Sequence, residues 1–241
     1  MSYTPFSDEQ YNQSLNIHQK ERNNIYPLIY GVRKENVSYD DDMPEYIKKI
    51  QDYEKARDVT FKVKYPLWEY PVNYSSQFRI REIDAQKFQD LTITLKNPDS
   101  NSPGELFKLQ ADVFPYGYQD QNGERLIELL VADCPKLRNG IINDTLQYEI
   151  RYNPRSHQPF VAIKFAELYK HNLVLLHWKE ANGKRYFLHG GPRQVDSNVS
   201  FARGMERASQ GYTAKGEHRD ALTQDEKNIV SRNIPNWWNQ D

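Results

Sequence analysis

Two aspartates, Asp112 and Asp133, have a spacing that could hold a divalent metal. They lie on two alternating stretches joined by Asn122-Gly123, a dipeptide typical of two-residue β-hairpin turns. Counting pairs outward from that turn brings Asp133 directly opposite Asp112. Facing carboxylates repel each other unless a cation or a shared proton compensates them. The candidate cofactor is therefore a divalent metal at Asp112 and Asp133, and Lys108 or Lys136 is the alternative source of positive charge.

The sequence next to this pair departs from the pattern of metal-dependent nucleases, in which an acid is followed by Glu/Asp-X-Lys. The residue two places after Asp133 is Pro135, and the lysine comes one place late, at Lys136. A bulge at Pro115 would also shift the pairing of the two stretches by one residue. No other cofactor fingerprint, metal-ligand cluster or nucleophile motif stands out, so the sequence requires no cofactor and does not by itself identify an enzyme.

Two histidines form a second candidate, because paired imidazoles could carry out acid–base cleavage without a metal. His177 and His189 lie on the two strands that we expect on either side of Asn182-Gly183. A regular two-residue hairpin pairs Trp178 with Phe187 and Glu180 with Arg185. In that register His177 and His189 point to opposite faces of the hairpin, and they share a site only if a bulge intervenes.

Aromatic residues crowd a segment that includes Trp68 and Tyr70 and is broken by Pro66 and Pro71. Proline keeps such a segment out of the interior of a sheet, so we expect some of these rings at a surface. Exposed rings with basic neighbours stack on bases or anchor a protein partner. The alternative is that the segment caps one end of a barrel.

Arginines accumulate toward the end of the chain, where Arg193, Arg203 and Arg207 are interspersed with glycines. Residues 145–220 carry twelve Lys/Arg against seven Asp/Glu, although the formal net charge of the whole chain is -1. The electrostatic field of the whole molecule therefore does not select a polyanionic partner, whereas the local excess of positive charge favours phosphate contacts.

The chain of 241 residues can bury one substantial core without disulfides or metals. Cys134 is the only cysteine, which excludes an internal disulfide and favours a reducing compartment. The sequence has no basic segment followed by an apolar signal region, and no apolar run long enough to cross a bilayer. We therefore expect a cytoplasmic protein that does not have a membrane as its partner.

The fold class that we expect is α+β with a mainly antiparallel sheet. A capping box at Ser7 and Gln10 predicts a helix over residues 8–22, and the acidic run before Pro44 predicts another over 44–57. From residue 59 onward the hydrophobic period is two. The predicted strands cover 59–65, 77–83, 91–96, 106–118, 125–133, 145–152, 160–169, 173–179 and 185–189.

Short connections between most of these strands favour a meander that forms a barrel or a sandwich. The organisation is then an N-terminal helical segment (1–58), an antiparallel β core (59–190), and a Gly/Arg-rich loop with C-terminal helices (191–241). All three parts are expected to belong to a single globular domain.

The leading functional hypothesis is a nucleic-acid-binding or nucleic-acid-processing protein, in which basic side chains contact phosphates and aromatic rings stack. The second is a non-catalytic interaction module whose exposed aromatic residues dock on a protein partner. The third is a metal-dependent hydrolase that uses Asp112 and Asp133.

Overall fold

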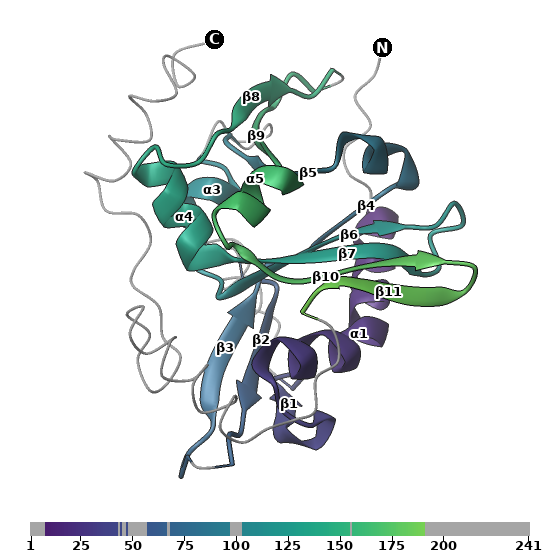
Figure 1. The fold of residues 1–241 in the computed structure, drawn as a ribbon, viewed down its shortest axis with the longest axis vertical. Helices are drawn as coiled ribbons and strands as arrows, with labels where there is room; N and C mark the ends of the chain where they lie inside the picture. The colour runs from purple at the N-terminus through teal and green to yellow at the C-terminus, as the bar shows by residue number, and fades with distance from the viewer. Residues whose placement is uncertain are drawn as a thin grey trace.

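The fold is α+β, with a mainly antiparallel sheet of many strands and few helices (Figure 1). It is seen in a computed structural model, which describes residues 8–42, 44, 47, 57–66, 68–96, 103–154 and 156–190. The predicted helix over 44–57 falls almost entirely outside the described residues, and the predicted C-terminal arm over 191–241 lies outside them completely.

The described helices are α1 (Asp8–Tyr30), α3 (Glu105–Lys108), α4 (Cys134–Ile142) and α5 (Phe165–Lys170), with short 3-10 helices η1 (Lys34–Asn36) and η2 (Ile83–Phe88). The strands are β1 (Val37–Tyr39), β2 (Val59–Val63), β3 (Val72–Ser76), β4 (Arg79–Arg81), β5 (Asp90–Thr94), β6 (Val113–Gln119), β7 (Leu126–Asp133), β8 (Glu149–Tyr152), β9 (Pro159–Lys164), β10 (Val174–Ala181) and β11 (Lys184–His189).

We expected a meander that forms a barrel or a sandwich; the strands instead form two separate sheets, and the barrel is wrong. The large sheet has the order β1-β2-β3-β6-β7-β10-β11, with β4 pairing beside β6, and the small sheet has the order β5-β9-β8. In the described part of the chain β1 and β11 remain edges of the large sheet, so no barrel closes. The meander is interrupted because α4, β8, β9 and α5 lie between β7 and β10 in the sequence, although β7 and β10 are neighbours in the sheet.

Two apolar clusters cover the two faces of the large sheet. The cluster on one face includes Ile25 and Tyr26 of α1 together with Phe61 and Trp178. The cluster on the other face joins the small sheet and the helices α3, α4 and α5 to strands β6, β7 and β10. Figure 1 shows this order of layers, with α1 on one side of β7 and β10 and the short helices on the other.

Helix α1 continues beyond the predicted end at residue 22, to Tyr30. Gly31 follows in the left-handed conformation, with φ of 62°, and the Val32 amide donates to the Pro27 carbonyl at 3.0 Å. This is the bonding pattern of a helix that ends at a left-handed glycine. The apolar segment 25–32 therefore extends the helix, because Ile25, Tyr26 and Ile29 bury against the sheet.

Two long predicted strands instead contain short helices. The segment 106–118 includes the end of α3 before β6 begins, and the segment 160–169 passes from β9 into α5. The alternation of apolar residues therefore predicts β6 and β9 correctly, but it extends beyond these strands into the neighbouring short helices. Strand β8 is also shorter than predicted, since it begins at Glu149.

The turn at Asn182-Gly183 is confirmed. Asn182 and Gly183 have φ values of 52° and 72°, and the strands pair Trp178 with Phe187 and Glu180 with Arg185. These two positive φ angles are the requirement of a type I′ turn.

We expect Gly183→Ala to lower the free energy of unfolding by about 1 kcal/mol, because only the left-handed backbone is penalised. A Cβ atom at Gly183 would meet no heavy atom within 4 Å, so steric overlap adds nothing. Urea unfolding followed by circular dichroism measures the change. An unchanged midpoint would contradict this account of the turn.

Candidate functional site

The two aspartates that sequence spacing placed opposite each other are not paired. The ladder between β6 and β7 shifts register between Tyr118 and Gln119, and Asp133 therefore faces Val113. The predicted pairing of Asp112 with Asp133 is thus wrong by one residue. The irregularity lies near the turn rather than at Pro115, which pairs regularly with Val131.

Both carboxylates accept hydrogen bonds from the protein. Asp112 Oδ2 accepts from the amide of Ser75 at 2.6 Å and from its hydroxyl at 3.1 Å. Asp133 caps the start of α4 by accepting from the amide of Lys136 at 3.2 Å. Within the described ranges no group of three or more His, Cys, Asp or Glu side chains is arranged to hold a metal. The metal site at Asp112 and Asp133 stays a prediction.

The predicted nucleic-acid or partner contact residues differ in their exposure. Tyr70 is 72% exposed, whereas Trp68 is partly buried against the α1 side of the sheet with its ring 5.4 Å from that of Tyr65. Arg193, Arg203 and Arg207 lie outside the described residues.

The two histidines are brought together by a bulge, contrary to the expectation from regular pairing. The register of β10 and β11 shifts between His177 and Trp178, so His177 pairs with His189. The ring of Tyr169 on α5 lies 5.8 Å from the His177 ring and 5.9 Å from the His189 ring. One tyrosine therefore contacts both imidazoles.

A chain of hydrogen bonds runs from this tyrosine into the protein. The Tyr169 hydroxyl lies 2.7 Å from His177 Nδ1, and His177 Nε2 lies 2.9 Å from Glu128 Oε1 on β7. An ionised carboxylate only accepts hydrogen bonds, so His177 Nε2 carries a proton, and in the neutral imidazole Nδ1 accepts from the phenol. We call these three residues the Glu128 relay.

Glu128 is held by further donors. Its side chain is fully buried and accepts from Gln86 Nε2 at 2.6 Å, from Gln89 Nε2 at 3.3 Å and from Lys179 Nζ at 3.1 Å. Burial alone would raise the pKa of Glu128, but the bonds from His177, Gln86 and Lys179 outweigh burial and lower it. Glu128 is therefore a carboxylate at neutral pH.

The fold positions the relay from three directions. Lys179 pairs with Glu128 across β10 and β7, so both side chains lie on the same face of the large sheet. The Phe165 amide at the start of α5 donates to the Gln89 carbonyl at 2.9 Å, which joins α5 to the end of η2. The Phe165 ring meets the His177 ring edge-on at 5.6 Å. His177 is thus fixed in orientation while Tyr169, in the last turn of α5, remains partly exposed.

This arrangement has the geometry of a hydroxyl, a base and an orienting carboxylate. Burial, assisted by the charge of Glu128, raises the pKa of Tyr169 to about 12. The phenol therefore stays protonated at neutral pH, and His177 Nδ1 is the group that can take its proton.

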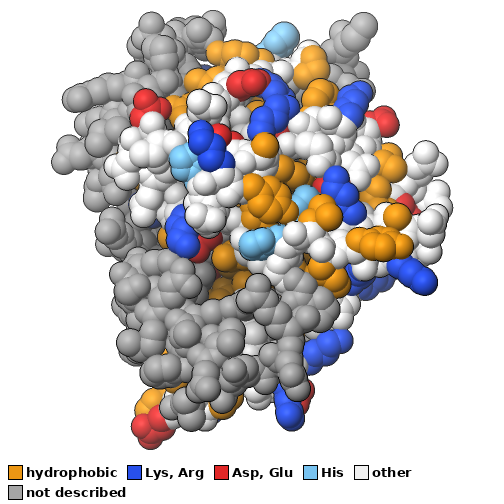
Figure 2. All heavy atoms as spheres, viewed as in Figure 1, with side chains coloured by type: hydrophobic (Ala, Val, Ile, Leu, Met, Phe, Trp, Pro, Cys, Tyr) orange, Lys and Arg blue, Asp and Glu red, His pale blue; other side chains and the backbone are white. Residues whose placement is uncertain are grey.

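Exposed apolar and basic side chains surround the relay. We call this set the rim: Phe88, Tyr186, Leu188, Lys87, Lys164 and Lys179. The rings of Phe88 and Tyr186 are 47% and 50% exposed. Figure 2 shows hydrophobic, histidine and basic side chains gathered on the face over α5, β10 and β11.

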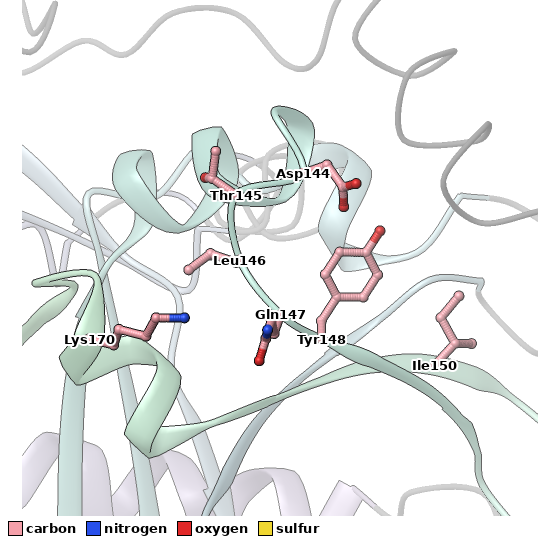
Figure 3. A pocket seen from close by; sticks show the side chains of 7 residues that line it. All are labelled: Asp144, Thr145, Leu146, Gln147, Tyr148, Ile150 and Lys170. Carbon is pink, nitrogen blue, oxygen red and sulfur yellow. The ribbon is translucent and has the colours of Figure 1, made fainter.

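A separate hollow of about 620 Å³ lies between α4, β8 and α5 (Figure 3). Its lining comprises Asp144, Thr145, Leu146, Gln147, Tyr148, Ile150 and Lys170. The Asp144 carboxylate lies beside Tyr148, and burial together with this charge raises the Tyr148 pKa. The hollow shares no lining residue with the relay or the rim.

Comparisons of the chain with protein-family models, with curated proteins and with solved structures gave no significant match. In the described ranges no helix is both long enough and apolar enough to cross a membrane.

Two residues of the relay, Glu128 and Tyr169, were not identified from the sequence. Glu128 could have been noticed in the sequence, because it is the one charged residue of β7 before the last residue of the strand, Asp133. A buried carboxylate in such a place requires partners. No sequence pattern marked Tyr169 as a site residue, since it falls in a segment that the alternation assigned to a strand.

Proposed function

We propose that this protein binds single-stranded nucleic acid at the rim around the Glu128 relay. The observation that supports the proposal is the exposure of two aromatic rings, Phe88 and Tyr186, beside lysine side chains. Unpaired bases expose their faces to such rings, and ammonium groups attract the phosphates between them.

Hydrogen bonds hold the two rings in one surface. Lys179 pairs with Tyr186 across β10 and β11, and its Nζ donates to Gln89 Oε1 at 3.1 Å. Gln89 directly follows Phe88, so this hydrogen bond joins the strand partner of Tyr186 to the residue next to Phe88. Lys179 therefore connects the two chain segments that carry the rings, and its ammonium is a candidate partner for the phosphate of a strand bound there.

The basic side chains at Phe88 add to this attraction. Lys164 Nζ donates to the Phe88 carbonyl at 2.8 Å, and Lys87 Nζ lies 5.3 Å from the centre of the Phe88 ring. Both lysines also remain at the surface. A base stacked on Phe88 would thus have two ammonium groups within reach of its phosphates.

Fluorescence anisotropy of the full chain with short single-stranded DNA and RNA oligonucleotides tests the proposal. We expect Phe88→Ala and Tyr186→Ala each to weaken binding by about 1 to 3 kcal/mol, because each removes a stacking ring. The affinity should fall steeply between about 50 and 200 mM salt, since phosphate contacts release counterions. Changing Arg193, Arg203 and Arg207 together to glutamine should reduce that salt dependence.

The matched control is Tyr152→Ala. Tyr152 is 49% exposed, similar to Tyr186, but it lies on β8 in the small sheet. This variant should bind as the wild type does. Absence of binding at about 50 mM salt, or an equal loss in all three aromatic variants, would refute the rim as a nucleic-acid site and favour a protein-docking surface.

A further inference from the structure

We propose that Tyr169 is a nucleophile that attacks a phosphodiester bond of the bound strand and forms a covalent phosphotyrosine link. This inference depends on the proposed function, because the rim supplies the strand, and it adds a chemical step to binding. The observation behind it is a continuous chain of hydrogen bonds from the hydroxyl of Tyr169, a partly exposed residue, through His177 to the buried carboxylate of Glu128.

The role of each group follows from its contacts. In the neutral imidazole whose Nε2 donates to Glu128, Nδ1 is the acceptor, and it faces the phenol at 2.7 Å. Glu128 cannot turn away, since Gln86 and Lys179 also donate to it. The imidazole is therefore held as a base directed at one hydroxyl, and that hydroxyl belongs to a residue at the surface.

A second histidine–tyrosine pair in the same chain shows what a structural contact looks like. His18 Nε2 lies 2.6 Å from the Tyr26 hydroxyl, but both side chains are buried. Nδ1 of His18 has no hydrogen-bond partner among the described residues, so no carboxylate orients the ring. The pair formed by Tyr169 and His177 differs in both respects, as it has the orienting carboxylate and it reaches the surface.

The chemical step balances without a co-reactant. The phenol oxygen of Tyr169 attacks phosphorus, and its proton passes to His177 Nδ1. The new oxygen–phosphorus bond replaces the bond from phosphorus to one sugar oxygen of the strand, which leaves with its electron pair. The ammonium of Lys179, 39% exposed and adjacent to Glu128, gives a proton to the departing oxygen. One phosphodiester is exchanged for another, so nothing is oxidised or reduced.

The test incubates the full chain with single-stranded DNA and RNA oligonucleotides labelled at either end, in buffer that contains EDTA. Denaturing electrophoresis separates a covalent adduct, and mass spectrometry of its peptides locates the link. The wild type should form an adduct on Tyr169 with one of the two labels. Tyr169→Phe should form none, and His177→Gln should form it at least about 100-fold more slowly, because the base is lost.

The same samples are measured by anisotropy, so adduct formation is compared per bound oligonucleotide. Tyr152→Phe is the control, because it removes a hydroxyl from an exposed tyrosine on another sheet. Binding without an adduct would overturn this inference and leave the proposed function standing, whereas absence of binding would overturn both. An adduct that persists in Tyr169→Phe, or cleavage only when Mg²⁺ replaces EDTA, would also overturn it.

Discussion

Replacing Glu128 by alanine should lower the free energy of unfolding by about 3 to 5 kcal/mol. The side chain is fully buried and accepts hydrogen bonds from His177 and Lys179 of β10 and from Gln86 and Gln89 at the end of η2. Its removal leaves His177 and Lys179 without their anionic partner and opens a space in a packed layer. Urea unfolding at neutral pH, followed by circular dichroism, measures the loss.

Two comparisons separate the causes of this loss. Glu128→Gln keeps the volume and removes only the charge, so it should lie between the wild type and Glu128→Ala. Glu149→Ala removes a carboxylate that likewise has a cationic partner, Arg151, but whose side chain is 61% exposed. The melting temperature of Glu149→Ala should be close to that of the wild type. If Glu128→Ala and Glu149→Ala had the same melting temperature, the Glu128 relay would not contribute to the stability of the fold.

Lowering the pH from 7 to 5 should cost the protein about 2 kcal/mol of stability through His18. Burial, assisted by the charge of Arg22, lowers the pKa of His18 from its ordinary 6.5 to about 3. Below pH 6.5, His18 therefore binds a proton in the unfolded chain but stays neutral in the folded protein. The stability that comes from neutral His18 is complete above pH 6.5 and is lost as the pH falls toward 3.

Thermal or urea unfolding at several pH values checks this assignment. His18→Gln keeps a polar group beside Tyr26 but cannot titrate, so its stability should vary much less between pH 7 and 5. His157→Gln is the control, because His157 lies exposed in the turn between β8 and β9. The stability that comes from the lowered pKa of Glu128 is complete above the ordinary glutamate range and is lost only below it, so it changes little between pH 7 and 5. A wild type of constant stability from pH 7 to 5 would contradict the account of His18.

Much of the local structure could be predicted because it depends on neighbouring residues. The turn at Asn182-Gly183 needs only two residues that tolerate positive φ angles, and the strands beside it show a period of two. The core strand β7 was predicted with an error of one residue at its start. The arrangement of these strands was not predictable in the same way, because the division into two sheets depends on contacts between distant segments.

The candidate site could be predicted even less well than the sheets, because it depends on the exact register of the strands. A shift of one residue at Tyr118 separates Asp133 from Asp112, and a shift at His177 brings that residue opposite His189. Side chains alternate between the two faces of a strand, so a single extra residue reverses which groups can meet. Pairwise counting from a turn cannot detect such a shift.

The sequence by itself determined the α+β class, the alternating strands and the type I′ turn, since these follow from propensities and periods of a few residues. The tertiary structure alone decided that Glu128 meets His177, 49 residues away, and that Tyr169 meets both histidines. The physical reason is that α5 packs between strands of both sheets, which places Tyr169 against strand β10. Such packing exists only after distant strands have come together.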